Sequence, residues 1–82
     1  MEKGSLSSSQ RIYEHLKKMI IDGEVLINEK LPNEYKLCQK YDVGRSTVRE
    51  AMRMLATNGY VRIKRGSGTY VISQTGNLSQ II

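Results

Sequence analysis

The chain has 82 residues, of which 39% are hydrophobic and 26% charged, and its formal net charge is +5. This length allows one small domain with a modest core and excludes a large enclosed pocket. One cysteine, Cys38, excludes an internal disulfide, and no segment approaches the roughly 20 apolar residues of a membrane span, so we expect a cytoplasmic protein without membrane contact.

The first predicted element is a helix that follows a polar N-terminus. Residues 1–7 are mostly small and polar, and we expect them to be disordered. Ser8 or Ser9 is expected to cap the helix, and Gly23 is expected to end it. A short extended segment is expected around residues 25–31. The spacing of apolar residues by three and four predicts a buried stripe made of Ile12, Leu16, Met19 and Ile20.

Two further helices are predicted in the middle of the chain. Asn33 is a natural cap for the second helix, and a tight turn at residues 42–44 leads to the third, which is predicted from about Arg45 to Asn58. The inward face of the second helix is expected to consist of Leu37, Cys38 and Tyr41. The apolar stripe of the third helix is expected to consist of Val48, Ala51, Met52 and Leu55.

A different face of the third helix is basic, because Arg45, Arg49 and Arg53 recur every four residues. Like charges at this spacing repel by a few tenths of a kcal/mol per pair in an isolated helix, so this face suits an anionic partner. Residues 36–65 contain eight basic and two acidic side chains, which extends the positive face beyond the helix. Taken alone, this charge pattern fits a solvated surface equally well.

Beyond the third helix the periodicity changes from helical to alternating. Val61 and Ile63 alternate with basic residues, which predicts a strand with one buried and one basic side. A turn at residues 65–68 and a returning strand at residues 69–72 complete a β-hairpin. Residues 74–82, which begin with four small or polar residues, are predicted to form a linker that leads out of the domain.

Three helices followed by a hairpin are typical of the winged helix-turn-helix fold. We therefore expect a mainly α domain with a small β-hairpin (an α+β fold), that is, three helices plus a small antiparallel sheet over residues 8–73. The third helix can enter a DNA major groove, which is about 12 Å wide, with its N-terminus leading. That terminus carries free N–H groups and the positive end of the helix dipole, both of which suit a phosphate.

The candidate binding residues follow from this geometry. Arg45 and Arg49 can each donate two hydrogen bonds to a guanine or to a phosphate. Ser46 and Thr47 can donate to phosphate, and the Thr47 methyl group can alternatively contact a thymine. At the hairpin tip, glycines allow close approach to a sugar-phosphate chain or a minor groove, and the expected contacts are Lys64, Arg65, Gly66, Ser67 and Gly68.

Two other binding functions remain open for this fold. A winged helix can be a protein–protein interaction module, although such a module seldom keeps three arginines exposed beside a basic hairpin. An RNA-binding winged helix would more often expose aromatic side chains for stacking. We expect no enzymatic activity, no cofactor and no metal site, because one His, one Cys and scattered carboxylates provide no nucleophile–base pair and no ligand spacing.

As a set, these motifs and their spacing resemble the DNA-binding domain of GntR-type bacterial transcriptional regulators over residues 10–73. The matching stretches are LPNE at residues 31–34, YDVGRSTVREAM at 41–52, GYV at 59–61 and GSGTYV at 66–71. The resemblance implies a repressor or activator that binds a short palindromic operator as a dimer. It also implies that Arg45, Arg49 and the hydroxyl residues between them contact double-stranded DNA, and that Gly68 approaches the minor groove.

The resemblance further implies a longer protein. Regulators of this type carry a C-terminal domain that binds a small-molecule effector and holds the homodimer. Residues 74–82 would lead toward such a domain, which is absent from this chain. We therefore expect a fragment of a metabolite-responsive repressor that is monomeric or weakly dimeric alone and binds one half-site weakly.

The chain departs from the family pattern at several positions. Gly44 stands where the family usually has Ser, which removes a capping hydroxyl and a phosphate contact. Asn33 replaces Ser and keeps the cap, and Tyr35 stands where many members have Arg, so its hydroxyl could reach a phosphate with less charge. Asn33 and Tyr35 complete the expected DNA contacts. The usual Pro-Gly is replaced around Asn28 and Glu29, so the loop after the first helix is expected to differ in shape.

Overall fold

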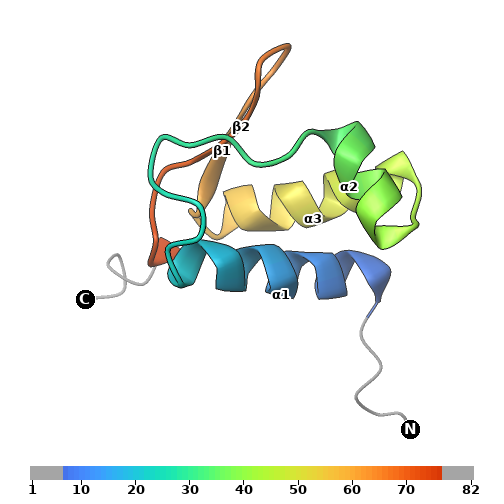
Figure 1. The fold of residues 1–82 in the computed structure, drawn as a ribbon, viewed down its shortest axis with the longest axis horizontal. Coiled ribbons are helices and arrows are strands. Elements are labelled where there is room, and N and C mark those ends of the chain that lie inside the picture. The colour runs from blue at the N-terminus through green and yellow to red at the C-terminus, as the bar shows by residue number, and fades with distance from the viewer. Residues whose placement is uncertain (1–6, 77–82) are drawn as a thin grey trace, which may run out of the picture.

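The computed structural model describes residues 7–76. Residues 1–6 of the expected disordered segment 1–7, and residues 77–82 of the predicted linker 74–82, lie outside the described residues. The described elements, in chain order, are α1 (Ser8–Ile21), α2 (Glu34–Tyr41), α3 (Arg45–Thr57), β1 (Val61–Lys64) and β2 (Gly68–Val71). In Figure 1, α3 lies between α1 and the strands, and the hairpin of β1 and β2 projects beyond the helices on the side away from α1. The predicted arrangement of three helices and a small antiparallel sheet is confirmed.

Side-chain caps define where the first two helices begin. Ser7, in an extended conformation, accepts a hydrogen bond from the Gln10 amide at 3.1 Å and caps α1. The prediction of Ser8 or Ser9 as the cap is wrong, because both residues already lie in the first helical turn. Asn33 caps α2 as predicted, since its side-chain oxygen accepts from the Lys36 amide at 2.8 Å.

A tight turn connects α2 to α3. Asp42 ends α2 in the left-handed conformation, with φ 54°, and Gly44 returns the chain to an extended conformation at the start of α3. The Val43 amide donates to the Cys38 carbonyl at 3.1 Å, which closes the end of α2. The third helix ends at Thr57, one residue before the predicted end, and Asn58 follows as its C-cap.

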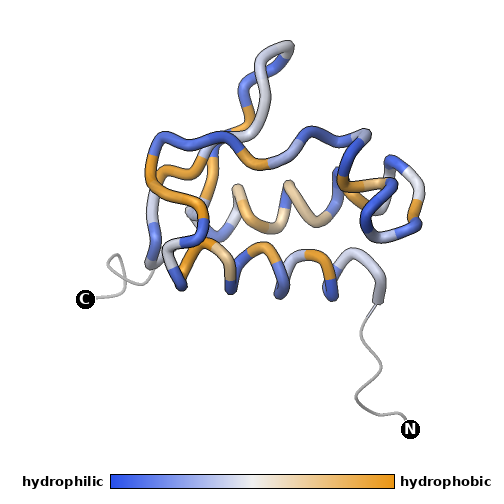
Figure 2. Tube along the Cα trace, in the orientation of Figure 1, coloured by the Kyte–Doolittle hydropathy of each residue, from blue (hydrophilic) through white to orange (hydrophobic). Residues whose placement is uncertain are grey.

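The core lies mainly between α1 and α3. Figure 2 shows the hydrophobic side of α1 facing α3 and its hydrophilic side facing away. All four residues of the predicted α3 stripe are buried, and so are three of the four in α1, with Met19 partly buried. Tyr13 is also buried, which the predicted α1 stripe did not include. On α2, Leu37 is buried, whereas Cys38 and Tyr41 are half-buried at the edge of the core.

The hairpin is buried only at its base. Val61 pairs with Val71, and both are buried against the helices. Ile63, which was predicted to face the core, is 47% exposed. That prediction is wrong because the outer half of the hairpin extends past α3 and has no helix to pack on (Figure 1).

The loop between α1 and α2 attaches the hairpin to the rest of the domain. Lys30 forms an antiparallel bridge with Tyr70, and the Leu31 amide donates to the Thr69 carbonyl at 2.8 Å. The Val71 amide donates to the Glu29 carbonyl at 2.9 Å. The predicted extended segment therefore runs beside β2 like a short third strand, and it holds the hairpin at a defined angle to the helices.

Two adjacent isoleucines test this packing. Ile20 is completely buried and Ile21 is 50% exposed. We expect Ile20→Val to lower the free energy of unfolding by about 0.5–1.5 kcal/mol, because it removes a methyl group from the core. Ile21→Val should change it by less than about 0.5 kcal/mol. Urea denaturation followed by circular dichroism measures both values, and equal losses would contradict the orientation of α1.

Candidate nucleic-acid interface

A groove of about 640 Å³ separates the hairpin from α3 and the start of α2. Its lining combines both sides of the predicted interface. Among the predicted contacts, those that line the groove are Asn33, Arg49, Lys64, Arg65, Gly66, Ser67 and Gly68. The structure thus brings the hairpin tip, residues 64–68 (the wing), and the middle of the third helix to one concave surface. The hairpin itself projects on the side of the domain away from α1 (Figure 1).

The remaining predicted contacts lie outside the groove lining, at the starts of α2 and α3. Arg45 and Ser46 are exposed in the first turn of α3, and Thr47 is half-buried there. Gly44 provides no side-chain cap for this helix. The first amides of α3 are therefore free of a capping side chain and can donate to an anion. Tyr35 is 65% exposed on α2, and its hydroxyl accepts a hydrogen bond from Gln39 at 3.0 Å.

The two arginines predicted to read DNA share one carboxylate. Glu34 lies at the start of α2, and its Oε2 accepts from Nε of Arg49 at 2.7 Å while its Oε1 accepts from Nη2 of Arg49 at 3.3 Å. The same Oε1 lies 3.4 Å from Nε of Arg45. This hydrogen bonding and the attraction of Glu34 raise the pKa of the Arg49 guanidinium, so Arg49 remains a cation.

Glu34 is not among the interface residues predicted from the sequence. One sequence feature could have indicated this role: Glu34 is an acidic residue in the first turn of one helix, and the next helix carries a row of arginines. Arg53, one turn beyond Arg49, is exposed and lines the groove, and it forms no ion pair within residues 7–76. Arg53 therefore adds a cation to the candidate interface. The sequence predicted it as part of the basic face of the third helix but not as a DNA contact.

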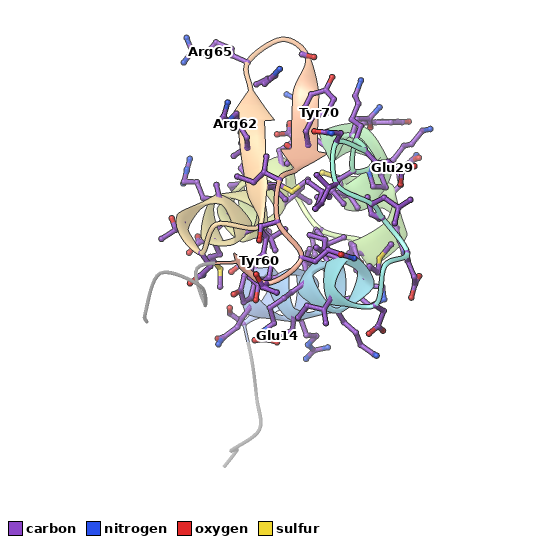
Figure 3. The ribbon with its side chains drawn as sticks, turned by 90° about the vertical axis from the view of Figure 1, so that its left-hand side faces the viewer. Glu14, Glu29, Tyr60, Arg62, Arg65 and Tyr70 are labelled. Carbon is purple, nitrogen blue, oxygen red and sulfur yellow. The ribbon has the colours of Figure 1, made fainter. Side chains whose placement is uncertain are left out.

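The wing presents its charges from a locally ordered hairpin. Arg65 lies at the hairpin tip and points away from the helices, whereas Tyr60 lies at the hairpin base beside α1 (Figure 3). The hydroxyl groups of Ser67 and Tyr70 are hydrogen-bonded at 2.7 Å across the end of the hairpin. Lys64 lies with its ammonium 5.4 Å from the centre of the Tyr70 ring, within the range of a cation–π contact.

Lys30 is a further cation at the wing. Its ammonium lies 5.9 Å from the centre of the Tyr70 ring, and its side chain covers Gly68. No local pattern predicts a role for Lys30 at the wing, because the contact depends on pairing between the loop after α1 and β2. The wing therefore combines cations from two separate segments of the chain.

The described residues contain no candidate metal site and no candidate membrane span. Within residues 7–76, no three His, Cys, Asp or Glu side chains converge so that they could hold a metal ion. No helix in the same part of the chain is long and apolar enough to cross a membrane. The groove is lined by cations and hydroxyl groups together with the carboxylate of Glu34 and the apolar side chains of Pro32, Met52 and Ile63. Its cations and hydroxyl groups suit phosphate and base edges.

The model of the GntR family of bacterial regulatory proteins matches residues 8–71. The chain belongs to the GntR family. The resemblance noted from the LPNE, VREA and GSGTYV motifs is thereby confirmed. The family match covers all three helices and both strands, so the interface described above lies within the matched region.

Curated GntR relatives are considerably longer than this chain. The chain is 38% identical over 72 residues to the Exu regulon transcriptional regulator of Escherichia coli K12, a match that covers 83% of this chain and 28% of that protein. It is 45% identical over 62 residues to the Uxu operon regulator of Haemophilus influenzae, covering 76% of this chain and 23% of that protein. The chain thus spans less than a third of the length of either relative.

Solved structures of GntR proteins share the fold. Streptococcus agalactiae GntR is 44% identical with a TM-score of 0.71, and the match covers 83% of this chain and 33% of that one. AraR(DBD), whose crystal structure is a complex with operator ORX1, is 30% identical with a TM-score of 0.84. That match covers 87% of this chain and 86% of the AraR chain.

The uncapped start of α3 in this GntR domain leads to a stability prediction. A Cβ atom at Gly44 would meet nothing within 4 Å, and the backbone there is already extended, with φ −82°. Gly44→Ser should therefore add a capping hydroxyl and raise the unfolding temperature by about 1–2 °C. Gly44→Ala is the control without a hydroxyl and should lower it. If the unfolding temperature shifts in the same direction for both variants, a hydroxyl at position 44 does not cap α3, and the prediction is wrong.

The glycines of the wing lead to a second prediction for the GntR domain. A Cβ atom at Gly68, where φ is +147°, would lie 2.6 Å from Cε of Lys30, whereas one at Gly66, where φ is +77°, would meet nothing within 4 Å. We expect Gly66→Ala to cost about 1 kcal/mol from backbone strain and Gly68→Ala to cost more. Adding Lys30→Ala should recover part of the free energy of unfolding lost in Gly68→Ala, but none of that lost in Gly66→Ala. Urea denaturation tests this order, and equal costs without recovery would contradict the contact.

Proposed function

We propose that this GntR-family domain binds a double-stranded DNA operator sequence-specifically, as the operator-reading part of a bacterial transcriptional regulator. The observation that carries the proposal is the match to AraR(DBD), which covers 87% of this chain and whose structure contains operator ORX1. The same fold at 30% identity supports the same mode of binding for this chain. The exposed arginines of α3, two of which line the groove together with the basic wing, supply the surface that such binding needs.

The proposed binding mode divides the interface between two grooves. The start of α3 enters the major groove, where Arg45 and Arg49 donate to guanine or phosphate. Ser46 and the free amides of Gly44 to Thr47 donate to phosphates on the same strand. The wing residues, which are Lys64, Arg65, Gly66, Ser67 and Gly68, lie against the minor groove.

The starts of α2 and α3 together form the second part of this surface. Tyr35 is exposed next to the cap residue Asn33, and both can reach the phosphate chain that borders the major groove. Arg53 and Lys30 add cations along the groove between α3 and the wing and beside the wing itself. Because phosphate contacts carry no sequence information, these residues contribute affinity, whereas Arg45 and Arg49 contribute discrimination.

We further propose that the chain acts within a longer homodimeric protein. The relatives it matches are three to four times its length, and their names describe regulators of a regulon and of an operon. Residues 74–82 would connect the domain to a C-terminal domain that binds a small-molecule effector and holds the dimer on a palindromic operator. Such a regulator would be a non-enzymatic repressor and would work in the cytoplasm, where the bacterial chromosome lies.

The proposal is tested by measuring the binding of the chain to a library of short DNA duplexes. Fluorescence anisotropy is the readout, and the measurement is repeated at several salt concentrations. We expect the chain to select a preferred half-site. Arg49→Ala should weaken binding to that half-site by roughly tenfold or more, because it removes a two-point contact to a base. Arg45→Ala should have an effect of similar size.

Arg11→Ala is the matched control. Arg11 is exposed on α1, the helix that lies on the opposite side of α3 from the hairpin (Figure 1), and its loss removes the same charge. We expect it to change the affinity by less than about twofold. A steep salt dependence without sequence preference, unchanged by Arg45→Ala or Arg49→Ala, would contradict the proposal and favour a protein–protein interaction module.

A further inference from the structure

Glu34 occupies a particular place at the proposed DNA interface, because its carboxylate lies between the two arginines that read the operator. It forms a two-point hydrogen bond with Arg49 across the gap between α2 and α3, and it also pairs with Arg45 at 3.4 Å. The Glu34 side chain is 32% exposed, whereas the arginine side chains are 55% and 72% exposed. The carboxylate is therefore the inner, more shielded member of the cluster.

The atoms that Glu34 uses leave the outer edges of both arginines open. Arg49 is held through Nε and one N–H of Nη2. Its Nη1 nitrogen and the second N–H of Nη2 therefore remain available for a two-point contact with a partner. Arg45 is held through Nε alone, so both of its terminal nitrogens remain available. An arginine loses up to about 2 kcal/mol of rotamer entropy when its side chain is fixed, and a side chain that is already restrained loses less on binding.

Glu34 also lowers the positive charge at one part of the interface only. Its charge offsets that of Arg45 and Arg49, the residues assigned to bases. Within residues 7–76, Arg53 and Arg65 form no ion pair, so the cations along the groove and at the wing keep their full charge. Attraction to phosphates of any sequence is thus reduced where base contacts are made and retained elsewhere.

We propose that Glu34 is a specificity-determining positioning residue, which orients Arg45 and Arg49 toward bases and suppresses their unspecific attraction to phosphates. This inference rests on the proposed DNA-binding function and goes beyond it. Glu34 itself contacts no base. It acts through the two guanidinium groups, and the quantity it raises is the ratio of affinities for the preferred and for an unrelated duplex.

Three substitutions in the 82-residue chain separate the position of the carboxylate from its charge. Glu34→Gln removes the charge and keeps the length of the side chain. Glu34→Asp keeps the charge but is one methylene too short to reach both arginines in the same way. Glu50→Gln is the matched control, because Glu50 is exposed on α3 and forms no ion pair within the described residues.

The measurement is the affinity of each variant for the preferred duplex and for an unrelated duplex of equal length, over a salt series. We expect Glu34→Gln and Glu34→Asp to lower the ratio of the two affinities by about three- to tenfold. Glu50→Gln should leave the ratio within about twofold of its original value. The slope of log affinity against log salt should steepen by about 1 for Glu34→Gln and stay unchanged for Glu34→Asp and for Glu50→Gln.

Thermal unfolding of each variant controls for damage to α2, since Glu34 also lies in the favourable first turn of that helix. Comparisons are made well below the lowest unfolding temperature, and loss of folded protein lowers both affinities by the same factor, so it does not change their ratio. An unchanged ratio in Glu34→Gln, or a higher one, would overturn the inference alone. An unsubstituted chain without any sequence preference would overturn the proposed function and the inference with it.

Discussion

The contact between α1 and α3 determines how the rest of the domain is oriented. The two apolar stripes are buried against each other, and the α3 stripe of Val48, Ala51, Met52 and Leu55 leaves little freedom for rotation of that helix. Because three arginines occupy a different face of the same helix, burying the stripe directs them outward. One physical requirement, removal of apolar surface from water, therefore produces both the core and the exposed basic face.

The position of the wing depends on a second contact, between the loop after α1 and β2. A two-stranded hairpin has little stability by itself, and this one is buried only at its base. The bridge between Lys30 and Tyr70 and the hydrogen bonds beside it continue the sheet by one short segment. This pairing fixes the direction of the hairpin relative to α3. Cations from both elements therefore line the groove between them.

Charge at the interface is distributed unevenly, and the geometry explains how. The outer cations of α3 and the wing are exposed and form no ion pair within residues 7–76, whereas Arg45 and Arg49 share the carboxylate of Glu34. A surface with a long-range positive field attracts nucleic acid of any sequence. The long-range field does not distinguish sequences. The restraint of Arg45 and Arg49 by Glu34 acts at short range, and in the proposed binding mode it favours one base sequence over another.

The sequence by itself determined the three helices, the hairpin, the Asn33 cap and the buried face of α3, because these depend on spacings and capping groups within a few residues. It also identified the family, since the LPNE, VREA and GSGTYV motifs are local. Only the tertiary structure decided which side chains meet across elements. Glu34 pairs with Arg49 from another helix, and Lys30 reaches the wing from a loop far away in the chain. The exposure of Ile63 was decided there as well, because alternation predicts two faces of a strand but not whether anything covers them.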